Sequence, residues 1–366
     1  MKKIIIAFCI FAFAVGCSSS DNNETETTKG YDRTAILTNW ADNLIIPAYE
    51  NYQAKVTTLA NATHSFTISP DETALASLRA AWMDAYIAYQ YISIYDFGKA
   101  ADLYLKQSAN TYPTDVAGIE ANITAGTYDL NLQAQFSKQG FPAIDYLING
   151  QGTDNETIAY FSGANAAAYL NAIASQLKTI AATVTSDWKT NYRAQYLANN
   201  GTSVTSSVNK TTNNFIKNLE KDIRTAKLGI PAGLFSNGIT YADKVEAYYK
   251  NNISKTLLNT AIQAEVDFFN GKAFNSNSTG ASLKSALDAV NAVREGKKLS
   301  DVINTQFTTV ATTNNALSDS FSQQVTNDNS KMVTSYNTLQ QNIIYLKVDM
   351  MQALNMTIDY VDGDGD

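Results

Sequence analysis

The sequence is poor in cysteine and histidine, the residue types that build most thiol nucleophiles and many metal sites. Its 366 residues include two cysteines, Cys9 and Cys17, and one histidine, His64. A zinc site that needs two histidines cannot form with one, and a thiol nucleophile needs a cysteine beside a base. Because both cysteines lie in the first 17 residues, the body of the chain has no disulfide and no thiolate ligand. The composition therefore excludes Cys/His catalysis and cysteine-based metal sites.

The first thirty residues have the pattern of an export signal followed by a polar tether. The chain opens MKKIIIAFCIFAFAVGCSSSDNN, with two lysines before a short apolar run. That run is too short to span a bilayer, and it predicts a signal peptide over residues 1–16. The residues before Cys17 resemble the lipobox of bacterial lipoproteins, which implies cleavage there and acylation of this cysteine. Residues 17–30 lack the apolar content to fold and predict a lipidated tether.

The predicted location follows from this leader. We expect an outer-membrane lipoprotein in the cell envelope of a Gram-negative-type bacterium, exposed to the periplasm or at the cell surface. Its main contact with the membrane would be the lipid anchor at Cys17.

The charge balance argues against a nucleic acid as partner. Without Lys2 and Lys3 the chain keeps 25 of its 27 basic residues against 34 acidic ones, a formal charge of −9. It also lacks a basic stretch with interleaved aromatic residues, which a nucleic-acid interface requires. Roughly 335 residues remain after the leader and tether, enough to favour two packed units over one.

The dominant hydrophobic period is helical. In SPDETALASLRAAWMDAYIAYQYISIYDFG, Ser69 fits an N-cap and Pro70 the first helical position. Apolar residues then recur at spacings of three and four, which marks one stripe facing a bundle core. The same test predicts helices over residues 31–62, 164–197, 205–227, 242–270, 281–295, 299–326 and 330–355.

These segments indicate an all-α fold of two helical-bundle domains. Pro47 is expected to kink or split the first helix. The polar segment 199–209 is the expected hinge, so the predicted domains are residues 31–200 and 201–366. The region 100–163 has Gly and Pro breaks, and such loops on a rigid scaffold often carry binding residues.

Several segments, in this order and spacing, resemble the imelysin-like family of bacterial envelope proteins. They are LRAAWMDAYIAYQ with Phe97-Gly98, NTYPTDVAGIE, GFPAIDYLINGQG, AKLGIPAG, KVEAYY and LKVDMMQALNMTIDYVDGDGD. The resemblance covers nearly the whole chain after the tether. It implies two bundle-like helical domains with a cleft near their junction, an association with a metallopeptidase activity, and a link to iron uptake.

The family signature, Gly-x-His-x-x-Glu, is altered in this chain. Gly140 matches the glycine, but Pro142 stands in the histidine position and Asp145 in the glutamate position. Family members often carry a glutamate five residues before the glycine of Phe-Gly, where this chain has Ser93. A histidine and an acid three apart on a helix can reach one ion, whereas proline offers neither donor nor acceptor. Asp145 is therefore the candidate metal ligand, and Gly140 and Ser93 are further candidates for the site.

Other ligands for an ion at Asp145 would have to come from elsewhere, and we name Asp96, Asp115 and Glu120. Oxygen ligands alone favour calcium or magnesium, while the resemblance points to iron, so the predicted cofactor is an iron or calcium ion. The alternative is structural. If a helix begins at Pro142, Asp145 lies near its first turn and can bond free backbone N–H groups there.

The function that fits these observations is non-catalytic, because Pro142 removes the peptidase histidine. We expect no catalytic residue and a binding role for an ion, a small ligand or a partner, within an iron-uptake system. One alternative is a divergent imelysin-type metallopeptidase. Another is a surface module that binds glycan or peptide and works with polysaccharide-utilisation components of the envelope.

Overall fold

The computed structural model describes residues 30–360 of the chain. The predicted signal peptide, Cys17 and almost all of the tether lie outside these residues. Among the helices of the described part, none is both long and apolar enough to cross a bilayer.

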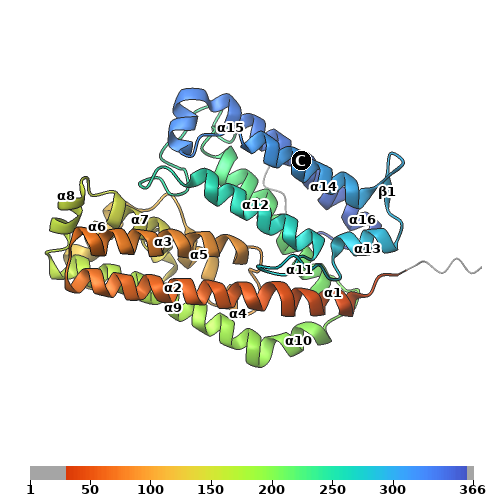
Figure 1. Ribbon diagram of the computed structural model, residues 1–366, viewed down its shortest axis with the longest axis horizontal. Helices are drawn as coiled ribbons and strands as arrows, with labels where there is room; N and C mark the ends of the chain where they lie inside the picture. The colour runs from red at the N-terminus through yellow and green to blue at the C-terminus, as the bar shows by residue number, and fades with distance from the viewer. Residues whose placement is uncertain (1–29, 361–366) are drawn as a thin grey trace, which may run out of the picture.

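The first half of the described chain is a group of helices arranged along α2, which packs on both α3 and α9 (Figure 1). Its elements are α1 (Arg33–Asn39), η1 (Trp40–Ile45), α2 (Ile46–Ile68), α3 (Glu72–Ile92), α4 (Lys99–Asp102), α5 (Leu105–Asn110), α6 (Val116–Ala125), η2 (Gln133–Lys138), α7 (Gly140–Asn149), α8 (Asp154–Tyr160), α9 (Ala164–Asp187), η3 (Trp188–Tyr192) and α10 (Arg193–Ala198).

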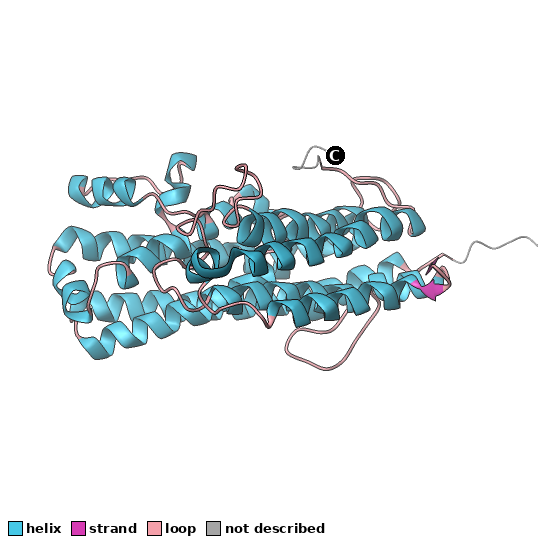
Figure 2. Cartoon of the chain, turned by 90° about the horizontal axis from the view of Figure 1, so that it is seen from above, coloured by secondary structure: helices cyan, strands magenta, loops and turns pink. Residues whose placement is uncertain are grey.

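The second half forms another helical group that lies above the first in Figure 1. Figure 2 shows the chain from above, with the helices in cyan and the short strands in magenta. The elements of this second group are α11 (Ser207–Lys217), η4 (Asn218–Gly229), α12 (Ser254–Asn270), α13 (Leu283–Ala289), β1 (Val293–Arg294), β2 (Lys297–Lys298), α14 (Leu299–Asn314), α15 (Phe321–Ile344), η5 (Tyr345–Met350) and α16 (Met351–Ala353). The antiparallel pair β1–β2 is a two-residue hairpin, so the expected all-α fold is confirmed.

The two groups share a packed boundary. Helix α3 packs against α12, and buried apolar side chains from both groups belong to one continuous cluster. Within this cluster, Trp40 from the first group stacks on Phe268 from the second, with ring centroids 4.6 Å apart. The division into domains at residue 200 stays a prediction, because the core runs through that boundary.

Several helices differ from the predicted ones at their ends and turns. The expected N-cap Ser69 is wrong, because Asp71 has the extended backbone of a cap and its side chain accepts the N–H of Ala74 at 2.7 Å. The π-helical turn η1 leads into α2 just before Pro47, whose ring nitrogen cannot donate to the preceding turn. The expected helix 242–270 is also wrong in its first half.

Residues 242–253 form turns instead of helix. Ala247 and Asn251 adopt positive φ values of 57° and 58°, a left-handed conformation that a right-handed helix cannot continue through. This segment runs along the boundary between the two helical groups, where it contributes Glu246, Tyr249 and Lys250 to the contacts described below.

Candidate functional site

The signature stretch GFPAID forms the start of helix α7, and Gly140 is its first residue. Gly140 has φ +76°, and a Cβ there would lie 2.3 Å from the carbonyl oxygen of Ala109 and 2.5 Å from that of Ser108. Only glycine allows this backbone shape and this close approach of α5. Pro142 is the third residue of the helix, two positions later than the predicted first one.

Asp145 is buried, with 1% of its surface exposed, and its carboxylate is fully engaged. Oδ2 accepts the backbone N–H of Tyr249 at 2.9 Å, and Oδ1 accepts the N–H of Lys250 at 3.0 Å. The side-chain amide of Asn149 also donates to Oδ1 at 2.9 Å. Burial raises the pKa of Asp145 to about 7, against the lowering effect of these three hydrogen bonds.

The structural alternative for Asp145 predicted bonds to backbone N–H groups, and the structure has such bonds, but to a different part of the chain. The carboxylate does bond backbone N–H groups, but those of Tyr249 and Lys250 from the second helical group, not those of its own helix. Asp145 thus joins the two groups. It lines a cavity of about 240 Å³, which we call the signature cavity, with Tyr112, Pro142 and Tyr248 among the other lining residues.

The other predicted ligands are not gathered around Asp145. Asp115 caps helix α6 by accepting the N–H of Gly118 at 2.9 Å, and Glu120 accepts the hydroxyls of Tyr146 and Tyr160 at 2.7 and 2.8 Å. Asp96 lies half-buried in the turn after α3. Residues 30–360 hold no cluster of three or more His, Cys, Asp or Glu side chains placed to hold a metal. Asp96, Asp115 and Glu120 therefore supply no second acidic ligand beside Asp145, and an ion bound there stays a prediction.

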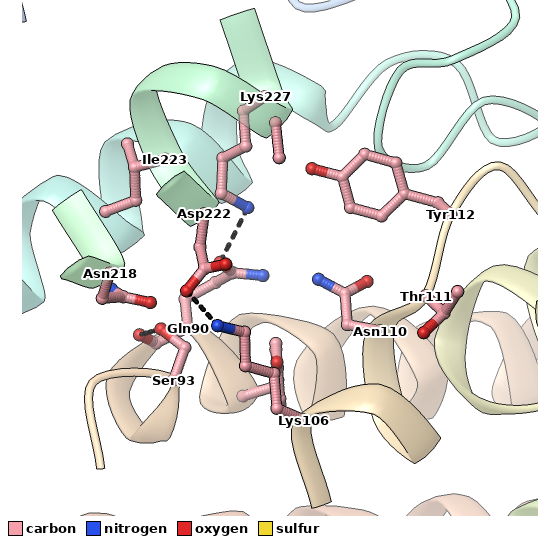
Figure 3. Close-up of a pocket in the computed structure, with 12 residues that line it drawn as sticks. Gln90, Ser93, Lys106, Asn110, Thr111, Tyr112, Asn218, Asp222, Ile223 and Lys227 are labelled. Carbon is pink, nitrogen blue, oxygen red and sulfur yellow. Dashed lines mark hydrogen bonds and ion pairs between the residues drawn. The ribbon is translucent and has the colours of Figure 1, made fainter. Parts of the chain in front are cut away.

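A second cavity, of about 150 Å³, lies between α3 and α5 on one side and η4 on the other (Figure 3). We call it the central cavity. Its polar lining includes Gln90, Ser93, Lys106, Asn110, Tyr112, Asn218, Asp222 and Lys227. Ser93, the predicted site residue at the family glutamate position, is therefore part of this cavity, while its hydroxyl donates to the carbonyl of Gln90 at 3.0 Å.

Lys227, which lines the central cavity, belongs to a buried charge pair with Glu246. Lys227 and Glu246 are 3% and 1% exposed, and their side chains make an ion pair. Lys227 also donates to Oε1 of Gln90 at 3.0 Å, and Glu246 accepts the side-chain amide of Asn110 at 2.8 Å. Tyr86 donates in turn to Asn110 at 2.5 Å. A buried pair persists in the folded state when hydrogen bonds of this kind compensate for lost hydration.

A second pair, Lys106 with Asp222, bridges the two helical groups across the cavity and is partly exposed. Deeper in, Asn218 donates to Glu265 at 2.6 Å, and the pKa of this carboxyl is raised well above its usual value by burial. The carbonyl oxygen Oδ1 of Asn218 is buried without a hydrogen-bond partner among the described residues. An orphaned acceptor at a cavity wall is a polar group that a ligand can satisfy.

The π-helical form of η4 explains why sequence reasoning missed this wall. Hydrogen bonding from i to i+5 places Asn218, Asp222 and Lys227, spaced four and five apart, along one face. In the α-helix that was expected, residues five apart are turned by about 140° from one another, so Asp222 and Lys227 would not share a face. The sequence offers no local signal for the π form, although π-helical turns are frequent at functional sites.

Comparison with known proteins identifies the family of the chain. The family model for imelysin matches residues 45–347. The protein belongs to the imelysin family. A comparison with curated protein sequences finds no match.

Two solved structures share the imelysin fold with this chain. An imelysin-like protein from Psychrobacter arcticum 273-4 has a TM-score of 0.71 at 17% identity, covering 90% of this chain and 97% of its own. A candidate iron-regulated protein A precursor from Parabacteroides distasonis ATCC 8503 has a TM-score of 0.72 at 18% identity, covering 87% and 94%. The recognition of an imelysin-like chain from its sequence motifs is thus confirmed.

Proposed function

We propose that this imelysin-family protein is a non-catalytic binding protein of the bacterial cell envelope. A lipid on Cys17 holds it on the outer membrane, and the central cavity holds a small ligand as part of an iron-related uptake system. The iron link is supported by the candidate iron-regulated protein of similar fold. The lipid anchor is supported by the leader sequence.

The observation that carries the binding role is the central cavity itself. It places two lysines, an aspartate and an amide oxygen that has no donor among the described residues around one cavity between two helical groups. Ligand sites prefer such boundaries and use a few convergent polar groups to orient the ligand. The signature cavity supports a peptidase less well, since Pro142 can neither bind a metal nor move a proton.

The test is to purify the full chain, denature it, and identify the released small molecules by mass spectrometry. We expect the wild type to release a ligand and Lys106→Met to release none, because the variant removes one charge of the cavity at a partly exposed position. Lys189→Met is the matched control, because it breaks an exposed ion pair with Glu50 on the outer surface.

Two results would overturn this function. Chelator-sensitive cleavage of an unfolded polypeptide would show a metallopeptidase. An iron- or calcium-induced rise in melting temperature that disappears in Asp145→Ala would move the binding site to the signature cavity.

The anchor has its own test in cells. Full-length wild type should fractionate with membranes and incorporate a labelled fatty acid, while Cys17→Ser should do neither. A Cys17→Ser chain that stays in the membrane fraction would contradict the lipid anchor.

A further inference from the structure

The central cavity has a donor side and an acceptor side. In Figure 3, Tyr112 and Asn110 lie on the right, Asn218 and Ser93 lie on the left, and Lys227 and Asp222 lie between them. Tyr112, Asn110 and Lys227 present N–H and O–H groups, whereas Asn218 and Asp222 present oxygen lone pairs, with Lys106 paired to Asp222. The cavity is therefore polar in a directional sense.

The donor side keeps hydrogen-bonding capacity. The described residues provide acceptors for two of the three N–H groups of Lys227, namely Gln90 and Glu246. The hydroxyl of Tyr112 makes no hydrogen bond to another residue in the range 30–360, and it points into the cavity. An ammonium and a phenol that converge in this way suit a carboxylate, which accepts several charge-assisted hydrogen bonds.

The acceptor side leaves one oxygen of the described residues without a donor. Oδ1 of Asn218 is buried and unpartnered among the described residues, and Asp222 has Lys106 as its cationic neighbour through Oδ2 alone. A buried acceptor without a donor is unfavourable until a donor arrives. An ammonium group carries three N–H donors, so it can bond Asn218 and Asp222 together.

Charge and size narrow the ligand further. Lys106 and Lys227 balance Asp222 and Glu246, so the cavity and its immediate wall have no formal net charge. A ligand with a net charge would bring in a buried, uncompensated ion, which is strongly unfavourable. A cavity of about 150 Å³ matches the size that accommodates benzene in an engineered protein cavity, so the ligand has few heavy atoms.

We propose that the ligand of the central cavity is a small free α-amino acid, bound as its zwitterion. The ammonium group bonds Asp222 and Asn218, and the carboxylate bonds Lys227 and Tyr112. The side chain faces Ile223 and Ala226, the apolar residues that η4 adds to the lining. Asp222 and Lys227 lie one π turn apart, which fits the short separation of the two charges in an amino acid. This inference rests on the proposed function and names its ligand class.

The test is calorimetric titration of the full chain, freed of bound ligand by refolding, with glycine, L-alanine, L-serine and L-valine. Propionate and ethylamine are the matched probes that keep one charge of alanine each. At least one amino acid should bind, and both one-charge probes should bind at least about tenfold more weakly, because each loses a charge-assisted contact. Asp222→Asn should weaken amino-acid binding at least about tenfold as well, while Asp84→Asn, at an exposed pair with Lys55, should not change it.

Three outcomes would overturn the inference. If propionate or ethylamine binds as tightly as alanine, binding in the cavity does not require both charged groups of a zwitterion. If no amino acid binds, while the wild type still releases a small molecule that Lys106→Met lacks, the ligand class is wrong and the binding function stands. If neither binding nor release is seen, both are wrong.

Discussion

The signature cavity and the central cavity lie at the same boundary and share Tyr112 in their walls, yet they differ in how their charged groups are used. In the signature cavity, Asp145 accepts three hydrogen bonds from its own protein. In the central cavity, the described residues leave one oxygen of Asn218 without a donor and one N–H group of Lys227 without an acceptor.

The difference teaches how a family site can change its role without losing its place in the fold. A carboxylate that satisfies two backbone N–H groups of Tyr249 and Lys250 holds two helical groups together. Its lone pairs are then less available to an ion. A cavity with unsatisfied donors and acceptors retains the chemistry that binding requires.

The largest expected effect tests the buried pair of the central cavity. Lys227→Met should lower the free energy of unfolding by about 3–5 kcal/mol, because it leaves Glu246 buried without its ion pair. Urea unfolding measures the loss. Lys189→Met at the exposed pair should change it by less than about 1 kcal/mol. Equal losses of unfolding free energy in both variants would show that the buried pair stabilises the fold no more than the exposed pair.

The next effect tests the signature cavity through its pH dependence. The pKa of Asp145 is raised from 3.8 to about 7 in the folded state, so between these values the folded protein binds more protons than the unfolded chain. Stability from this group is therefore present at low pH and lost as the pH rises through about 7. The difference in unfolding free energy between wild type and Asp145→Asn should grow by roughly 2–3 kcal/mol from pH 8 to pH 5.

Asp84→Asn is the control for this titration, because its exposed carboxylate pairs with Lys55 at the surface. If the unfolding free energies of the wild type and Asp145→Asn differ by the same amount at every pH, Asp145 remains ionised in the fold. That result would restore it as a candidate ligand for a cation.

A smaller effect tests the backbone under the signature. Gly140→Ala should destabilise the fold by about 1–3 kcal/mol, since alanine is strained at φ +76° and its Cβ would meet the carbonyl of Ala109. Gly201→Ala should have little effect, because a Cβ added at this position meets no atom within 4 Å. Thermal unfolding compares the two, and a tolerated Gly140→Ala would mean that the start of α7 can shift away from α5.

The sequence predicted the helical class, the family and the position of Gly140, because apolar periods and motif order are local and additive signals. It did not predict that Asp145 bonds residues about a hundred positions later, since no local pattern encodes a contact between two helical groups. Ser93 was identified through the family glutamate position, but its neighbours Asp222 and Lys227 were not. Their common face depends on a π-helical turn in a segment whose sequence reads as an ordinary α-helix.

The most direct test of the central claim is the amount of small molecule released by denatured Asp222→Asn and Asp145→Asn chains, measured side by side with the wild type. We predict that Asp145→Asn releases as much ligand as the wild type and that Asp222→Asn releases none. The reverse pattern, with ligand lost only in Asp145→Asn, would contradict the account and return the binding site to the family signature.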